Sequence, residues 1–420
     1  MNNPDVVIIG GGAAGLMAAI WAARMAPGTE VLVLDCARKL GAKILVSGGG
    51  RCNVTHERVT ESDFAGSTPN AIRKVLRRLQ VPDTVAFFRE LGIELKREET
   101  GKLFPTTDSA RSVLQALLEA AAQAGVKIQH PRRVEYLNPM GSGFRAGGEW
   151  GQVSAAHAIL ATGGKSLPKS GSDGHGYAIA QSLGHSLTPH ILPALVPLTL
   201  PSDHFCRGLT GLTVPARLEV QDNNRSRLAT FTDSTLCTHF GLSGPSILNI
   251  SRYYLHARLQ DPDTRLVISW LPSKTSEELD AEIRRLGKTK VINYLKRLLP
   301  GRLAQALIQQ AGIDDGLYGY ALTRRDRLLL VKIATRMELP VVGDRGFGLA
   351  EVTAGGVPLK ELHLETMESR ACPGLFLCGE ICDVDGRIGG FNFQWAWSSG
   401  FVAGVAVGNR LKGQKQTETR

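Results

Sequence analysis

In the first forty residues, two continuous apolar runs are separated by glycines and by a stretch of small residues with helical character. A continuous apolar run from Val6 predicts a buried strand, the three glycines after it predict a turn, and the small residues up to Ala23 predict a helix. A second apolar run, from Val31 to Leu34, predicts another buried strand. Strand, turn, helix and strand in this order are typical of a parallel α/β fold.

Downstream, the pattern predicts more helices and strands before its character changes. Helices are expected at 70–79, at 84–91 and from Asp108 or Ser109 to Ala124, and strands at 127–129, 133–137, 143–146 and 158–161. Alternating segments such as 213–220 and 265–270 then favour a β-rich region. From 273 to about 336 the pattern is helical, and glycine-rich segments return after Gly346.

These changes predict how the chain is divided. With 420 residues the chain is too long for one simple core. We expect an α/β nucleotide-binding domain made of residues 1–190 and 346–420. The insertion between them is expected to hold a β-barrel-like domain at 191–272 and a helical subdomain at 273–345.

The glycines after the first strand have the G-x-G-x-x-G spacing of dinucleotide-binding proteins, at Gly10, Gly12 and Gly15. We expect this turn, with Ala14, to hold a pyrophosphate at the helix N-terminus, and Asp35 to bind a ribose. A membrane span or a signal peptide is the alternative reading of this uncharged run. No basic segment precedes the run, glycines interrupt it and no cleavage-type site follows, so we expect a dinucleotide, either NAD or FAD.

The C-terminal region favours FAD over NAD. An apolar strand leads into Gly379-Glu380, with Asp383 and Asp385 following, and Gly389 to Gln394 would open a helix. Glutathione-reductase-type flavoproteins end in this way, with an acid on the ribityl chain and a helix N-terminus facing the flavin. The alternative is an ordinary strand, loop and helix with incidental acids. No second G-x-G-x-x-G follows a strand, so NAD(P)H, as reductant, is expected to dock transiently.

Composition adds expectations about partners and compartment. The net charge is +10, and residues 284–302 carry seven basic side chains and no acid, which favours an anionic partner such as RNA. Arg284, Arg285, Lys288 and Lys296 recur at helical spacings, so several are expected to share one helix face and contact phosphates. A solvated helix is the alternative reading of that run. Seven cysteines without C-x-x-C pairs indicate reduced thiols in the cytoplasm, and Cys378 and Cys382 are read as packing residues rather than as a metal site. No later apolar stretch predicts a membrane span.

Seven ordered motifs between Val6 and about Gly404 make the chain similar to the bacterial flavoprotein family of YhiN and the bile-acid-inducible N protein. They are GGGAAG, AKILVSGGGRCN, ATGGKSLPKSGSDGHGY, THFGLSGP, TAGGV, GEICDVDG and GGFNFQWAWSSG. The resemblance implies a Rossmann-like FAD-binding domain of the two-dinucleotide-binding-domain flavoprotein type, with an inserted β domain and a helical subdomain.

The resemblance also implies which residues hold FAD. Besides the first turn and Asp35, these are Lys43, Ser47, Gly48, Gly49, Arg51, Asn53, Thr162, Gly163, Gly164, Gly379, Glu380, Asp383, Gly390, Phe391, Asn392 and Gln394. Cys52 is the first candidate proton donor, and its alternative role is packing beneath the glycine loop. His239 is the second candidate, as donor or substrate ligand, and its alternative role is to position a loop.

Family members have been linked to two reductions of carbon–carbon double bonds. The leading hypothesis is an NAD(P)H- and FAD-dependent enzyme that reduces uridine to dihydrouridine in large-subunit ribosomal RNA. The first alternative is reduction of a small steroid-like or other apolar enone. The second is a non-enzymatic, FAD-stabilised RNA-binding factor. The oligomeric state is left open.

Overall fold

The computed structural model describes residues 3–141 and 143–418. The chain divides into two compact units, one built from the chain up to Pro193 and from Glu351 onward, and one of Ala194–Ala350. Each unit has its own cluster of buried hydrophobic residues. The first unit is therefore made from both ends of the sequence, and the second lies between them in the chain.

The first unit is centred on a seven-stranded sheet of order β21-β22-β23-β11-β1-β2-β7. Five strands are parallel, namely β1 (Val6–Ile9), β2 (Val31–Leu34), β7 (Lys127–Gln129), β11 (His157–Leu160) and β23 (Leu375–Leu377). Strand β22 (Glu368–Ser369) pairs antiparallel with β23, and the edge strand β21 (Leu362–His363) pairs antiparallel with β22. All residues of β1 and β2 are buried, which explains why both appear in the sequence as continuous apolar runs.

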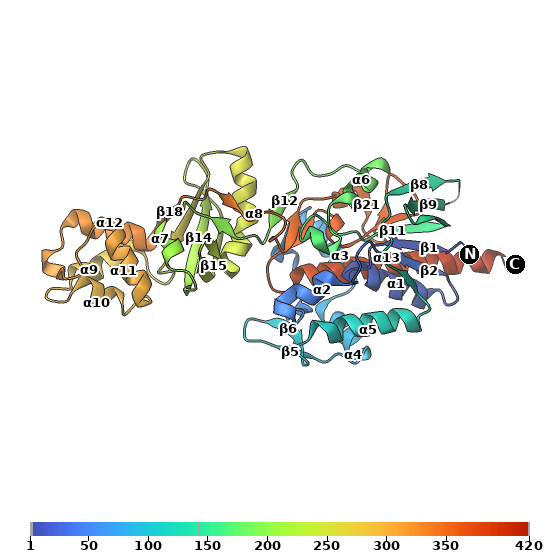
Figure 1. Cartoon of the computed structure of the whole chain (residues 1–420), viewed down its shortest axis with the longest axis horizontal. Helices are drawn as coiled ribbons and strands as arrows, with labels where there is room; N and C mark the ends of the chain where they lie inside the picture. The colour runs from blue at the N-terminus through green and yellow to red at the C-terminus, as the bar shows by residue number, and fades with distance from the viewer. Residues whose placement is uncertain (1–2, 142, 419–420) are drawn as a thin grey trace. The chain divides into compact units, whose positions relative to one another are not determined.

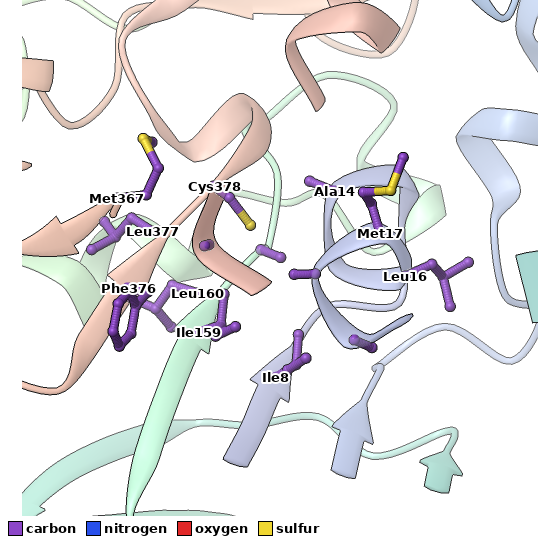
Figure 2. Close-up of a cluster of buried hydrophobic side chains, with 14 of the residues drawn as sticks. Ile8, Ala14, Leu16, Met17, Ile159, Leu160, Met367, Phe376, Leu377 and Cys378 are labelled. Atoms are coloured by element: carbon purple, nitrogen blue, oxygen red, sulfur yellow. The ribbon is translucent and has the colours of Figure 1, made fainter. Parts of the chain in front are cut away.

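Helix α1 (Ala13–Met25) lies against the last helix, α13 (Phe391–Glu418) (Figure 1). The backbones approach closely, because a Cβ on Gly400 or Gly404 would collide with the carbonyl oxygen of Ala14 or Ala18. Figure 2 shows part of the core, in which Ile8 of β1 and labelled side chains of β11, β23 and α1 belong to one buried cluster. The two ends of the chain thus share one core.

The remaining elements of the first unit surround this sheet. The helices are α2 (Ala42–Val46), α3 (Pro69–Leu76), α4 (Val81–Glu90), α5 (Ala110–Gln123) and α6 (His175–Ser182). Small sheets are formed by β8 (Tyr136–Met140), β9 (Gly143–Gly148) and β10 (Gly151–Ala155), by β3 (Thr55–His56), β5 (Leu95–Arg97) and β6 (Lys102–Pro105), and by β4 (Phe64–Gly66) with β24 (Val384–Gly386). Helices and strands expected here exist within a few residues of their predicted bounds. The strand predicted at 133–137 begins at Tyr136 because it pairs with β9.

The second unit joins one sheet to a group of helices. The strands are β13 (Leu198–Thr199), β14 (Thr213–Gln221), β15 (Arg227–Thr238), β16 (Gly241–Ser243), β17 (Arg265–Ser269), β18 (Met337–Leu339) and β19 (Gly343–Asp344), and β18 and β19 are its two edges. The helices are α7 (Phe205–Gly208), α8 (Pro245–Gln260), α9 (Ser276–Arg284), α10 (Val291–Leu295), α11 (Gly301–Gln310) and α12 (Arg324–Thr335). Sheet residues such as Ile268 and helix residues such as Leu307 belong to one buried cluster.

The basic run at 284–302 does not form one helix, contrary to the expectation that its side chains share a helix face. Helix α9 ends at Arg284, α10 begins at Val291 and α11 begins at Gly301. Gly287 has a φ of +50°, and Pro300 precedes α11, so the backbone is broken at both places. Within residues 3–141 and 143–418, no helix combines the length and apolarity that a membrane crossing requires.

Candidate functional site

The turn between β1 and α1 has the geometry of a phosphate cradle. Gly10 has a φ of +109°, and a Cβ on Gly15 would collide with the carbonyl oxygen of Gly10. A Cβ on Gly12, which precedes α1, would meet nothing within 4 Å. The first glycine therefore makes the turn, the third lets helix and strand pack, and the second borders open space at the helix N-terminus. This arrangement fits a pyrophosphate.

Asp35, directly after β2, is fixed at this cradle. Its Oδ2 accepts a hydrogen bond from the Gly11 amide at 2.6 Å, and its Oδ1 accepts one from the Ala37 amide at 2.7 Å. Each carboxylate oxygen keeps a lone pair, because a carboxylate has about four acceptor positions. The carboxylate is thus oriented by backbone and still able to accept from a ribose hydroxyl.

A polar network joins four segments that are distant in the sequence. Lys43 Nζ lies 2.6 Å from Glu380 Oε2 and donates to Ser166 Oγ at 2.7 Å. The other oxygen of Glu380 accepts from Ser166 Oγ and from the Thr353 amide, both at 2.9 Å. Thr353 Oγ1 in turn accepts from the Lys165 amide at 2.8 Å. Glu380 and Lys43 therefore fix the loops after β11 and β23 against α2.

Ser166 and Thr353 were not among the predicted site residues. Both lie within motifs singled out in the sequence, ATGGKS and TAGGV, but neither residue type predicts a partner. Thr162, Gly163 and Gly164 lie in the loop after β11, and a Cβ on Gly164 would collide with the Thr353 side chain. The loop therefore packs directly on Thr353.

The loop after α2 carries three consecutive glycines in the left-handed region, among them Gly48 and Gly49 with φ of +55° and +69°. Ser47 Oγ donates to the Ile44 carbonyl at 2.8 Å and fixes the start of the loop. Arg51 Nη1 lies 2.6 Å from Glu98 Oε1, and the guanidinium lies 4.0 Å from the Phe104 ring centroid. Arg51 therefore ties the loop to the β5–β6 hairpin.

Cys52 is completely buried, and burial raises the pKa of its thiol to about 12. A thiol held so strongly in its protonated form is a weak acid at neutral pH. These observations favour the packing role for Cys52 over proton donation. His239 belongs to the second unit and is exposed in the turn between β15 and β16, where its backbone carbonyl accepts from Arg207 Nε at 2.7 Å.

The C-terminal half of the candidate site lies between β23 and α13. The Gly379 amide donates to Ser399 Oγ at 2.9 Å, and its carbonyl accepts from the Trp395 indole at 3.0 Å. Asp383 is buried, and its carbonyl accepts from the Ser67 amide at 2.8 Å. These bonds fix the turn that leads from the sheet into α13.

The N-terminus of α13 lies against a buried acceptor. Gly390 has a φ of +94°, and a Cβ there would lie 2.6 Å from the Thr55 carbonyl oxygen and 2.8 Å from Asn53 Oδ1. Asn53 is 8% exposed, and its Oδ1 has no hydrogen-bond partner among the described residues. Since a buried acceptor is normally satisfied, this atom fits a donor such as the N–H of a flavin ring.

Three predicted cofactor residues at this helix start make contacts within the protein. Gln394 is buried; its Nε2 donates to the Leu79 carbonyl at 3.0 Å and to Thr84 Oγ1 at 2.9 Å, and its Oε1 accepts from Thr55 Oγ1 at 2.7 Å. Asn392 closes the preceding turn through two bonds with the Gly386 backbone, and Phe391 stacks on the His56 ring, with centroids 4.8 Å apart. We infer that these residues position the site. His56 is a neighbour that the sequence did not indicate.

The fold and this site define a FAD-dependent oxidoreductase with a Rossmann-type nucleotide-binding domain. A family model described as the HI0933-like protein Rossmann domain matches residues 4–406. The chain belongs to this family.

Two relatives are similar over nearly their whole length. The chain is 34% identical to the 3-dehydro-bile acid delta(4,6)-reductase of Clostridium scindens, over 96% of this chain and 98% of that protein. It is also 34% identical to the ribosomal RNA dihydrouridine synthase of Escherichia coli, over 96% and 97%.

Two solved structures share the fold at low sequence identity. Escherichia coli quinol fumarate reductase FrdA is 15% identical, with a TM-score of 0.52 over 99% of this chain and 73% of that chain. The 3-ketosteroid delta1-dehydrogenase of Sterolibacterium denitrificans is 13% identical, with a TM-score of 0.52 over 98% and 100%. These likenesses concern the fold alone.

Proposed function

We propose that the protein reduces a carbon–carbon double bond with NAD(P)H as reductant, and that its substrate is uridine in large-subunit ribosomal RNA. The observation that carries the proposal is the similarity over 96% of the chain to two relatives whose names describe such reductions on different substrates. The net charge of +10 favours the polyanionic substrate over an apolar one. Such a substrate would place the protein in the cytoplasm, where its seven free cysteines would stay reduced.

The residues of the first unit are suited to binding FAD, which when bound supplies hydride transfer. The glycine turn and the α1 N-terminus would hold the pyrophosphate, and Asp35 would bind the ribose. Asn53 Oδ1 would accept a hydrogen bond from the flavin ring. The network of Lys43 and Glu380 would hold the loops around it in one arrangement.

Reduction of the uracil C5=C6 bond adds a hydride to one carbon and a proton to the other. The hydride comes from NAD(P)H, which becomes NAD(P)⁺, and the proton comes from a protein group that solvent reprotonates. Burial makes Cys52 unsuited to this second step, so His239 is the remaining proposed donor. Replacing His239 by Gln should slow product formation while FAD stays bound, and unchanged turnover would exclude the residue as the donor.

The test of the substrate is a mass-spectrometric map of dihydrouridine in ribosomal RNA from a strain that lacks the protein. We expect one or more dihydrouridines to disappear and to return when the wild-type chain is supplied. Persistence of every dihydrouridine would refute the RNA substrate. Anaerobic bleaching of the flavin absorbance by NADH or NADPH would separately exclude a non-enzymatic RNA-binding factor.

Reduction of an apolar enone is the second candidate, because the bile acid reductase is as similar to this chain as the RNA enzyme is. This candidate predicts NAD(P)H consumption on addition of a steroid enone and no change in ribosomal RNA. Both assays use the same purified holoenzyme, so their results can be compared directly.

A further inference from the structure

Two segments of the second unit lie side by side and form a short ribbon that begins directly after α9. The Val291 amide donates to the Leu317 carbonyl at 3.1 Å, and the Gly319 amide donates to the Thr289 carbonyl at 2.9 Å. The Tyr320 amide donates to the Gly287 carbonyl at 3.0 Å. We call residues 287–291 and 317–320 the tyrosine ribbon. Its backbone is fixed by these bonds, so the side chains on it are held in place.

The tyrosine ribbon presents two stacked aromatic rings to solvent. Tyr318 is 38% exposed and Tyr320 is 69% exposed, and their rings lie 5.8 Å apart at an interplanar angle of 13°. Among the described large hydrophobic residues, Tyr320 is the most exposed. Parallel rings on a fixed backbone at the surface have the form of a platform on which further flat groups can stack.

One basic side chain borders this platform, and two more lie next to it along the chain. Lys290 Nζ lies 5.7 Å from the centroid of the Tyr318 ring. Lys288 is exposed and has no ion pair with another described residue, and Arg285 is exposed at the end of α9. The platform therefore combines aromatic faces with cations that are available to an anion.

The acids near the ribbon are already engaged. Asp314 Oδ1 accepts from the Gly316 amide at 2.7 Å, and Asp315 Oδ2 accepts from Gln305 Nε2 at 2.5 Å. Glu282 binds Lys274 Nζ at 2.6 Å and the Tyr294 hydroxyl. These bonds hold the carboxylates locally and leave the Lys288 ammonium without a carboxylate partner.

We propose that the tyrosine ribbon binds single-stranded RNA, with bases stacked on Tyr320 and Tyr318 and phosphates bound by Lys288 and Lys290. Stacking needs bases whose faces are open, which unpaired nucleotides offer and a duplex does not. The cations around the rings match the phosphates of such a strand and oppose a basic or an apolar partner. This inference rests on the proposed RNA substrate and names a surface that would hold it.

The test is fluorescence anisotropy of a labelled twelve-nucleotide single-stranded RNA titrated with the FAD-loaded full chain. The double variant Tyr318→Ala, Tyr320→Ala should bind roughly 25-fold more weakly or worse, because the loss of one stacked base usually weakens binding at least about 5-fold and two are lost. Tyr136→Ala in β8 is the matched control, since Tyr136 is 37% exposed in the first unit, and it should bind as the wild type does. Tyr320→Phe keeps the ring and should also bind normally.

The salt dependence of the same binding tests the cations. Lys288→Ala should reduce the slope of log affinity against log salt by about 0.7, the usual contribution of one phosphate contact on a single strand. Lys127→Ala is the control, because this exposed lysine lies on β7 and pairs with Glu30. Equal slopes for wild type and Lys288→Ala would overturn the phosphate role of Lys288.

Two outcomes overturn the surface as a whole: a wild-type chain that does not bind the oligonucleotide, or tyrosine variants that bind it as well as wild type. Each variant must first show wild-type FAD content and NAD(P)H-driven flavin bleaching, so that misfolding is not mistaken for lost contact. The proposed reaction fails separately, when wild-type chain does not restore dihydrouridine to the deletion strain. The anisotropy result then still decides the surface.

Discussion

Substitutions in the glycine turn after β1 should separate FAD binding from folding. Gly12 has φ −82° and ψ −168°, which alanine adopts without strain, and its Cβ would point into open space. In Gly15→Ala the new methyl would collide with the Gly10 carbonyl oxygen. We therefore expect Gly12→Ala to affect FAD and Gly15→Ala to affect the fold.

The magnitudes follow from where each methyl group would lie. Apo Gly12→Ala should unfold at the wild-type temperature or be stabilised by about 0.4–1 kcal/mol, because alanine restricts the unfolded chain. Its methyl would occupy the cradle, and crowding of about 1–3 kcal/mol corresponds to FAD binding weakened roughly 5- to 150-fold. Gly15→Ala forces backbone atoms apart, so we expect the apoprotein to lose about 3 kcal/mol or more.

The assay has two parts on the same apoprotein preparations. Quenching of flavin fluorescence gives the dissociation constant of FAD, and thermal unfolding without FAD gives stability. Wild-type FAD affinity in Gly12→Ala would show that no pyrophosphate lies over Gly12. An apoprotein of Gly12→Ala as unstable as that of Gly15→Ala would refute the distinction between the two glycines.

Two further predictions concern buried side chains near the candidate site. Gln394→Leu leaves the Thr84 hydroxyl and the Leu79 carbonyl without this partner. The free energy of unfolding, measured with urea, should therefore fall by about 2–4 kcal/mol. For the exposed control Gln123→Leu it should stay within about 0.5 kcal/mol of wild type. Burial raises the pKa of Cys52 from 9.0 to about 12, whereas in the unfolded chain the thiol ionises above pH 9. Between pH 9 and 12 the folded chain therefore binds a proton that the unfolded chain has lost. The free energy of unfolding should fall there by about 1.4 kcal/mol per pH unit from this group. Cys52→Ala should flatten the profile by that amount, and identical pH profiles would contradict the assigned burial effect.

The parts of the fold that the sequence predicts best are those set by local pattern. Strand β2 lies at the predicted residues because a buried parallel strand is apolar throughout. Strand β7 also lies where it was predicted, because a glycine ends the helix before it and so marks where the strand can begin. The roles of Gly10, Gly12 and Gly15 were likewise expected from their spacing, and the turn has the geometry that those roles require.

The parts that were missed depend on contacts between distant segments. Ser166 meets Glu380 because the loops after the neighbouring parallel strands β11 and β23 leave the sheet at the same edge. Thr353 reaches the same carboxylate from β20 (Val352–Ala354), which belongs to another sheet. The sequence could not predict the partners of the Gln394 amide either, because α4 and β3 supply them only in the folded chain. The prediction of one helix face for the basic residues at 284–302 is wrong for a local reason. Gly287 adopts a positive φ and interrupts the helix that their spacing suggested.

The close contact between α1 and α13 has a consequence for how the protein is made. Gly400 and Gly404 can reach the backbone of Ala14 and Ala18 only after α13 has left the ribosome. The second unit, encoded in between and holding its own core, can fold earlier during synthesis. The first strands and helix of the nascent first unit therefore stay incompletely covered until α13 is available, and FAD retention should appear only after α13 has been synthesised.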